Sequence, residues 1–117
     1  MSEQYCLTDE QRLIQDTVRT FAREQVAPHA DAIDAEAAYP QHMFDALKGL
    51  GLFALPFPES MGGSGSMLSA CLAIEELRRI CYNTAYLLVV QWVPFGAILA
   101  GGTEEQKARY LPADRLC

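Results

Sequence analysis

The stretch from Ala85 to Ala100 constrains the fold more than any other part of this sequence, because Gln91 is its only strongly polar side chain. A membrane-spanning helix needs about 20 consecutive apolar residues. These sixteen residues fall short of that length and are interrupted by Pro94 and Gly96. We therefore expect a helix that is buried on most of its sides in the core of a domain, and no membrane span.

Two capping boxes mark helix starts on either side of this stretch. In Thr8–Gln11 and in Thr103–Gln106, a threonine hydroxyl can accept from the amide three residues later, and the glutamine can reach back to the threonine amide. The second of these helices should be short and stop before Pro112. The first should end or kink at Pro28, and it carries an apolar stripe at helical spacing, formed by Ile14, Val18, Phe21 and Ala22.

Three further helices are expected between these. A short acidic helix covers 31–38, and the next has Pro40 at its first helical position and stops around Gly49 and Gly51. The third begins after Gly65, and Asn83 and Thr84 should break it and cap the apolar helix. Its expected buried stripe consists of Ala70, Ile74, Leu77 and Cys81.

No alternating strand pattern is present, so the sequence predicts an all-α fold. We expect one domain over 1–117, an orthogonal or up-and-down bundle of five or six helices around a central apolar helix. The segment Leu55–Gly65, with two prolines and three glycines, is expected to be a connector that is extended at its prolines and reversed at its glycines. Cys71 and Cys81, expected on one helix, are interpreted as small core hydrophobes.

Charge and composition exclude several function classes. A net charge of −6 disfavours a nucleic-acid-binding surface and an anionic membrane. The N-terminus lacks a basic run leading into an apolar core, so the cytoplasm is the expected compartment. His29 and His42 are interpreted as solvated surface, and the GGSG at 62–65 lacks the lysine of a phosphate loop. Taken from the residues alone, the sequence predicts no catalytic, cofactor-binding or metal-binding residue.

Four segments, in order, resemble the N-terminal helical domain of the acyl-CoA dehydrogenase family. They are LTDEQRLIQDTVRTFAREQVAPHA, LKGLGLFALPFPESMGGSG, AIEELRRICYNTAYLL and GGTEEQKARYLP. The resemblance implies oxidation of the Cα–Cβ bond of an acyl-CoA thioester, in which a glutamate takes the α-proton and FAD accepts the β-hydride. It also implies that FAD and the catalytic glutamate belong mostly to a middle β domain and a C-terminal helical domain.

Neither of those two domains is visible in this sequence. The chain alone is therefore not expected to hold FAD or to be active, and none of its glutamates is assigned as the base. It is expected to be a fragment, a truncated product or one piece of a split assembly. The implied partners are the acyl-CoA substrate of the complete enzyme, an electron-transfer partner that the sequence does not identify, and further subunits in a homo- or hetero-oligomer.

The resemblance also places an acyl-pocket wall on the apolar helix, because the family's helix before the GTEEQK marker lines that pocket. The corresponding residues are Tyr86, Val89, Val90 and Val93, which could alternatively be ordinary core residues. Nearby, Trp92, Pro94 and Phe95 replace residues that are smaller or polar in the family. The alternative function is a non-catalytic helical interaction module, or a truncated remnant that kept the fold. The isolated chain is expected to expose an apolar face of this helix and to associate through it, whereas a strictly monomeric chain would favour the stand-alone module.

Overall fold

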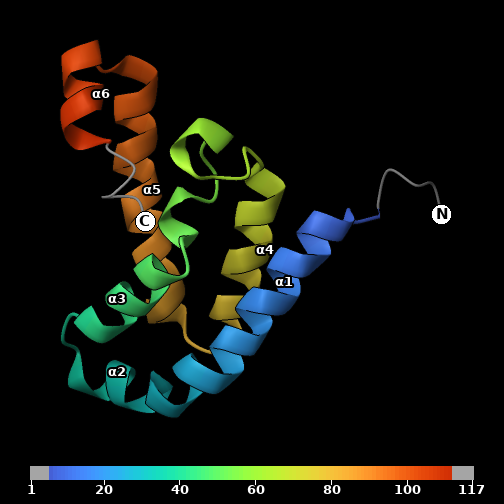
Figure 1. Cartoon of the computed structure of the whole chain (residues 1–117). Coiled ribbons are helices and arrows are strands. Elements are labelled where there is room, and N and C mark those ends of the chain that lie inside the picture. The colour runs from blue at the N-terminus through green and yellow to red at the C-terminus, as the bar shows by residue number, and fades with distance from the viewer. Residues whose placement is uncertain (1–5, 112–117) are drawn as a thin grey trace.

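The computed structural model describes residues 6–111, and within that range every regular element is helical (Figure 1). This confirms the predicted all-α class. The elements are α1 (Asp9–Phe21), a π-helical turn (Ala22–Val26), a 3₁₀ turn (Ala27–His29), α2 (Ala30–Glu36), α3 (Gln41–Gly49), 3₁₀ turns at Leu52–Ala54 and Glu59–Met61, α4 (Met67–Arg78), α5 (Tyr82–Gly101) and α6 (Glu104–Tyr110).

The helices form a slab that measures 44 × 42 × 18 Å. Its thickness is about two helix diameters. A helix that is covered on one side therefore has no further layer of described residues on its other side. α4 packs between α1 and α5, α2 and α3 lie at one end, and α6 folds back beside the far end of α5 (Figure 1).

Both capping boxes are present in the structure. The Thr8 hydroxyl accepts from the Gln11 amide at 3.2 Å, and the Gln11 side chain accepts from the Thr8 amide at 3.0 Å. The same pair of bonds joins Thr103 and Gln106 at 3.2 and 2.9 Å. α6 ends at Tyr110, as predicted, and Pro112 lies outside the described residues.

Pro28 kinks the first helical run rather than ending it, because the chain passes through the π-helical and 3₁₀ turns directly into α2. α2 stops at Glu36, two residues earlier than expected, and Ala37 takes a left-handed conformation with φ 50°. Pro40 is the N-cap of α3 and not its first helical residue. Its carbonyl accepts from the amides of Met43 and Phe44.

The connector Leu55–Gly65 curls back on itself, so the prediction that its prolines hold it extended is correct only at Pro58, with φ −57° and ψ 156°. The amide and hydroxyl of Ser64 both donate to the Leu55 carbonyl, at 3.0 and 2.8 Å. A Cβ on Gly63 would collide with the carbonyl oxygens of Ala54 and Phe57. Glycine is required at this position because two backbone segments meet there.

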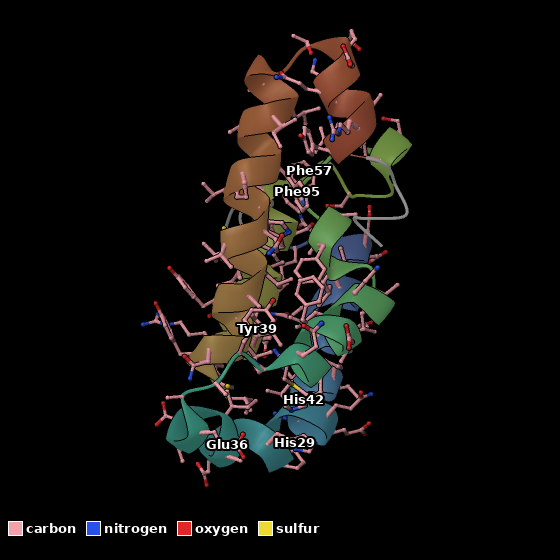
Figure 2. All side chains as sticks on the ribbon, turned by 90° about the vertical axis from the view of Figure 1, so that its left-hand side faces the viewer. His29, Glu36, Tyr39, His42, Phe57 and Phe95 are labelled. Atoms are coloured by element: carbon pink, nitrogen blue, oxygen red, sulfur yellow. The ribbon has the colours of Figure 1, made fainter. Side chains whose placement is uncertain are left out.

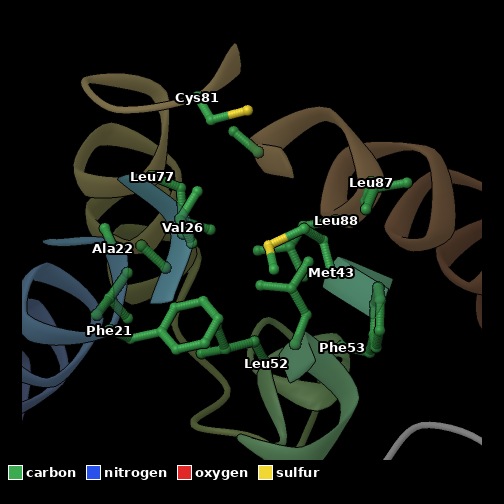
Figure 3. Close-up of a cluster of buried hydrophobic side chains, with 14 of the residues drawn as sticks. Phe21, Ala22, Val26, Met43, Leu52, Phe53, Leu77, Cys81, Leu87 and Leu88 are labelled. Atoms are coloured by element: carbon green, nitrogen blue, oxygen red, sulfur yellow. The ribbon is translucent and has the colours of Figure 1, made fainter. Parts of the chain in front are cut away.

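One apolar core joins α1, α3, α4 and the first half of α5 (Figure 3). Phe53 and Leu47, which are 1% and 0% exposed, are the largest fully buried side chains. The predicted stripe of α1 lies in this core except for Ile14, which is half-buried. Around them gather Val18, Phe21, Ala22, Val26, Ile33, Met43, Leu52, Ala73, Leu77, Ala85, Leu87 and Leu88.

The junction between α4 and α5 differs from the prediction. α4 ends at Arg78 and α5 begins at Tyr82 with Cys81 as its N-cap, so Asn83 and Thr84 neither break nor cap a helix. Thr84 is buried in the first turn of α5, where its hydroxyl donates to the Cys81 sulfur at 3.3 Å.

The interpretation of Cys71 as a core residue is wrong, whereas that of Cys81 is confirmed. At about 100° per residue, Cys71 lies about 160° around α4 from the fully buried Ala73, and it is therefore exposed. The two cysteines also do not share a helix.

Candidate functional site

The four residues predicted for the acyl pocket lie together on the exposed side of α5. Tyr86, Val89, Val90 and Val93 are 51%, 36%, 36% and 68% exposed, and they fall within an arc of about 100°. Tyr82, which is 59% exposed, lies one turn before Tyr86. We call these five residues the α5 outer face. The alternative that the four are ordinary core residues is wrong, and their role in a pocket remains a prediction.

The opposite side of α5 is buried only near its start. Thr84, Ala85, Leu87 and Leu88 are buried, whereas no residue from Val89 to Gly101 is. The expectation that the apolar helix is buried on most of its sides is therefore wrong for its second half. No further layer of described residues covers that half.

α5 also runs without a break for 20 residues and includes Pro94. By length and composition alone it could cross a membrane, a test that the core helix of a water-soluble protein also passes. The argument from a short, interrupted apolar run is thus wrong, and the absence of a membrane span remains a prediction.

A hollow lies on each side of the α5 outer face. The α4–α5 hollow, of about 790 Å³, includes Met67, Cys71, Ile74, Val89 and Trp92, with Arg78, Arg79 and Glu75 also in its lining. The α2–α5 hollow, of about 510 Å³, lies between residues 33–40 and the first half of α5. The predicted site residues are divided between them: Val89 lines the first hollow, Tyr86 and Val90 line the second, and Val93 lines neither.

Of the three residues expected to differ from the family, Trp92 and Phe95 lie away from the α5 outer face. The indole nitrogen of Trp92 donates to the Phe53 carbonyl at 3.0 Å. The Phe95 ring meets the Phe57 ring of the connector edge-on at 6.4 Å (Figure 2). Pro94, by contrast, is exposed. Trp92 therefore ties the second half of α5 to the turn Leu52–Ala54, and Phe95 ties it to the connector.

Aromatic side chains concentrate around the α2–α5 hollow. The Tyr82 and Tyr86 rings are stacked, with centroids 5.9 Å apart and planes 14° apart. Tyr39, 58% exposed, lies on the other side of the hollow beside α5 (Figure 2). The sequence analysis did not select Tyr39 or Tyr82, although the spacing of Tyr82 and Tyr86 by four residues is a signal that was available.

Glu76 is a buried carboxylate with a structural partner. Its side chain is 3% exposed, and Arg19 donates to both of its oxygens, at 2.9 and 3.2 Å, across the α1–α4 contact. These hydrogen bonds hold the pKa of Glu76 below its usual range, against the opposing effect of burial. A carboxylate held ionised in this way is a weak proton acceptor, which makes Glu76 unsuited to act as a catalytic base.

Three features of the described residues bear on cofactor and metal binding. No buried side-chain nitrogen or oxygen among them lacks a hydrogen-bond partner that a cofactor could supply. The space a phosphate would need beside Gly63 is filled by the carbonyls of Ala54 and Phe57. The His29 and His42 rings meet edge-on at 5.2 Å (Figure 2), but residues 6–111 contain no group of three or more potential metal ligands.

Comparison with known proteins yields a family match over nearly the whole chain. The family model described as "Acyl-CoA dehydrogenase, N-terminal domain" matches residues 8–113. A protein named as a probable acyl-CoA dehydrogenase of Bacillus subtilis is 40% identical over 90% of this chain and 28% of its own length. Benzylmalonyl-CoA dehydrogenase of Aromatoleum aromaticum is 46% identical over 73% of this chain and 23% of its own length. The chain thus spans about a quarter of the length of these relatives.

A solved structure matches the fold as well. It comes from work on the electron transferring flavoprotein of Acidaminococcus fermentans and flavin-based electron bifurcation. The two chains superpose with a TM-score of 0.86 at 32% identity, over 97% of this chain and 30% of the other.

Proposed function

Because this chain belongs to the acyl-CoA dehydrogenase family, in which it corresponds to the N-terminal domain, we propose that it forms part of the acyl-chain pocket of an FAD-dependent acyl-CoA dehydrogenase. The α5 outer face supports this proposal. It places a continuous set of apolar and aromatic side chains in the open, between two hollows. A surface of this kind normally marks a binding site.

The contribution of these residues is to bind the acyl chain and exclude water. Val89, Val90 and Val93 offer no hydrogen-bonding group, so an acyl chain lying on them displaces only weakly held water. A dry pocket strengthens the electrostatic interactions that stabilise charge on the thioester carbonyl. Acyl-CoA dehydrogenases generally use FAD, which accepts the hydride when bound. We propose that polypeptide outside residues 6–111 supplies most of the flavin site.

The exposed apolar side chains of the α5 outer face are expected to be covered in the complete protein. In the proposed enzyme this face is covered by the bound acyl group and by the remaining domains or a neighbouring subunit, so the complete protein is proposed to be an oligomer. The family's substrate is an acyl-CoA, and the cytoplasm is the proposed compartment because the relatives are metabolic enzymes.

A chimera tests the proposal. Residues 8–113 would replace the matching part of the Bacillus subtilis relative, and oxidation of acyl-CoA would be followed with an artificial electron acceptor. We expect an FAD-containing, active enzyme. Val90→Asp should lower kcat/KM by about 100-fold or more, because a charge placed in a dry apolar pocket loses several kcal/mol of solvation.

The matched control is Leu13→Asp, a similar change at an exposed apolar residue on α1, which is 67% exposed. It should leave kcat/KM close to that of the parent chimera. Equal effects of the two substitutions would contradict the pocket role of α5. A folded, FAD-loaded chimera that oxidises no acyl-CoA would favour the alternative, a non-catalytic helical interaction module.

A further inference from the structure

The α2–α5 hollow has a composition suited to one chemical class of ligand. Its walls combine the rings of Tyr39 and Tyr86 with Pro40, Leu87 and Val90. Its volume of about 510 Å³ lies within the range of small-molecule sites, about 300–1,000 Å³. Aliphatic groups alone would suffice for a straight hydrocarbon chain, whereas tyrosine rings offer flat faces and edges that favour another ring.

The backbone beside the hollow positions Tyr39 through an unfavourable left-handed conformation at Ala37. Ala37 is the only non-glycine residue among those described that has a positive φ, and alanine rarely adopts this conformation. The left-handed turn ends α2 and directs the chain back toward α5, so that Tyr39 and Tyr86 line the same hollow. A second contact holds the Tyr39 ring, whose centroid lies 6.3 Å from that of Phe44.

The polar residues of the hollow define the ligand further. Asp34 and Asn83 are part of its lining, and none of the described residues that line it is a lysine, arginine or histidine. A carboxylate on the ligand would therefore meet a like charge without a compensating cation. An uncharged ring is compatible with this lining, and the Asn83 amide can hydrogen-bond a neutral polar group beside it.

We propose that the acyl group of the substrate carries an uncharged aromatic or alicyclic ring, which lies in the α2–α5 hollow against Tyr39 and Tyr86. This inference rests on the acyl-pocket function proposed above and adds the substrate class. The Tyr82 ring is stacked on the Tyr86 ring and so helps to hold it in position.

The chimeric holoenzyme described above tests the proposal with two probes that contain the same number of carbon atoms, 3-phenylpropanoyl-CoA and nonanoyl-CoA. The measured quantity is the ratio of their kcat/KM values. Tyr86→Leu and Tyr39→Leu keep an apolar side chain but remove the ring. Each should lower the ratio by about three- to tenfold, which is the change in rate expected from the energy of one contact between two aromatic rings.

Tyr110→Leu is the matched control, since Tyr110 is a 43% exposed tyrosine on α6 outside this hollow. It should leave the ratio unchanged. Asp34→Asn should improve use of 3-(4-carboxyphenyl)propanoyl-CoA relative to the uncharged phenyl probe. If neither Tyr86→Leu nor Tyr39→Leu changes the ratio, the ring proposal is overturned. The acyl-pocket function would still stand in that case, provided that the chimera oxidises nonanoyl-CoA.

If the chimera does not assemble, amide NMR of the 117-residue chain provides a second measurement. We expect 3-phenylpropanoyl-CoA to shift the amides of Ala37, Tyr39 and Asn83 more strongly than nonanoyl-CoA does. Equal shifts from both probes would overturn the ring proposal alone. The absence of any shift along the α5 outer face with either probe would instead contradict the acyl-pocket function.

Discussion

The two halves of α5 are both apolar, yet their surroundings differ. Tyr82–Gln91 contains all of the helix's buried residues, and Ala85, Leu87 and Leu88 among them belong to the core shared with α1, α3 and α4. Trp92–Gly101 contains none. Trp92 donates to Phe53 in the turn Leu52–Ala54, Phe95 contacts Phe57 in the connector, and α6 packs against α5. Hydrophobic composition thus shows that a surface has to be covered by something. It does not show that the same domain covers it.

The largest expected effect comes from removing a core side chain in the first half. Leu88 is 0% exposed, so Leu88→Ala should lower the free energy of unfolding by about 2–5 kcal/mol through lost burial and a residual cavity. Ile98→Ala, at a half-buried position in the second half, should cost about 1 kcal/mol. Urea denaturation followed by far-UV circular dichroism measures both, and equal losses would remove the distinction between the halves.

The ion pair between Arg19 and Glu76 holds together the α1–α4 layer on which the first half packs. Since the pKa of Glu76 is lowered in the folded state, its contribution is complete above the usual glutamate pKa of about 4.3 and is lost as the pH falls through the lowered value. Glu76→Gln should therefore destabilise the protein at neutral pH, and the difference from wild type should shrink in acid.

The exposed neighbour Glu75 provides the control for this experiment. It pairs with Arg79 at the surface, where ion pairs contribute little, so Glu75→Gln should leave the pH dependence of stability nearly unchanged. Unfolding titrations at a series of pH values measure both variants. A difference between wild type and Glu76→Gln that grows as the pH falls would contradict the assigned direction.

Pro94 weakens the second half of α5 from within, because proline lacks the amide that would donate to the preceding turn. Pro94→Ala should raise the free energy of unfolding by about 2 kcal/mol. The substitution removes the helix penalty of proline, about 3 kcal/mol, but it also removes the stabilisation that proline gives by stiffening the unfolded chain. Hydrogen exchange should show the gain mainly in residues 92–101. Slower exchange confined to residues 82–91 would contradict this account.

The smallest stability effect is expected on the outer face itself. Val93 is 68% exposed, so Val93→Ser should change the free energy of unfolding by no more than about 0.5 kcal/mol. It should nevertheless reduce binding of an apolar dye and self-association in light scattering, because it shortens the exposed apolar surface. Unchanged dye binding and association would show that this surface does not drive association.

The features that could be predicted from sequence are those determined within a few residues. Thr8 and Thr103 cap their helices through bonds to residues three positions away, and the apolar spacing of α1 identified its buried side. The ordered motifs identified the family, and the resemblance selected Tyr86, Val89, Val90 and Val93, which regular helix geometry places on one side of α5. Each of these depends on backbone geometry that is nearly independent of the rest of the chain.

The tertiary structure alone decided which surfaces are covered and which distant groups meet. Arg19 and Glu76 are 57 positions apart, and Tyr39 reaches the hollow beside Tyr86 only because Ala37 takes a left-handed turn. Cys71 is exposed and Cys81 buried because burial depends on which helix lies opposite, and an apolar residue has the same local pattern whether or not it is covered. For the same reason, the sequence revealed the length of apolar surface on α5, and only packing determined which part of it stays exposed.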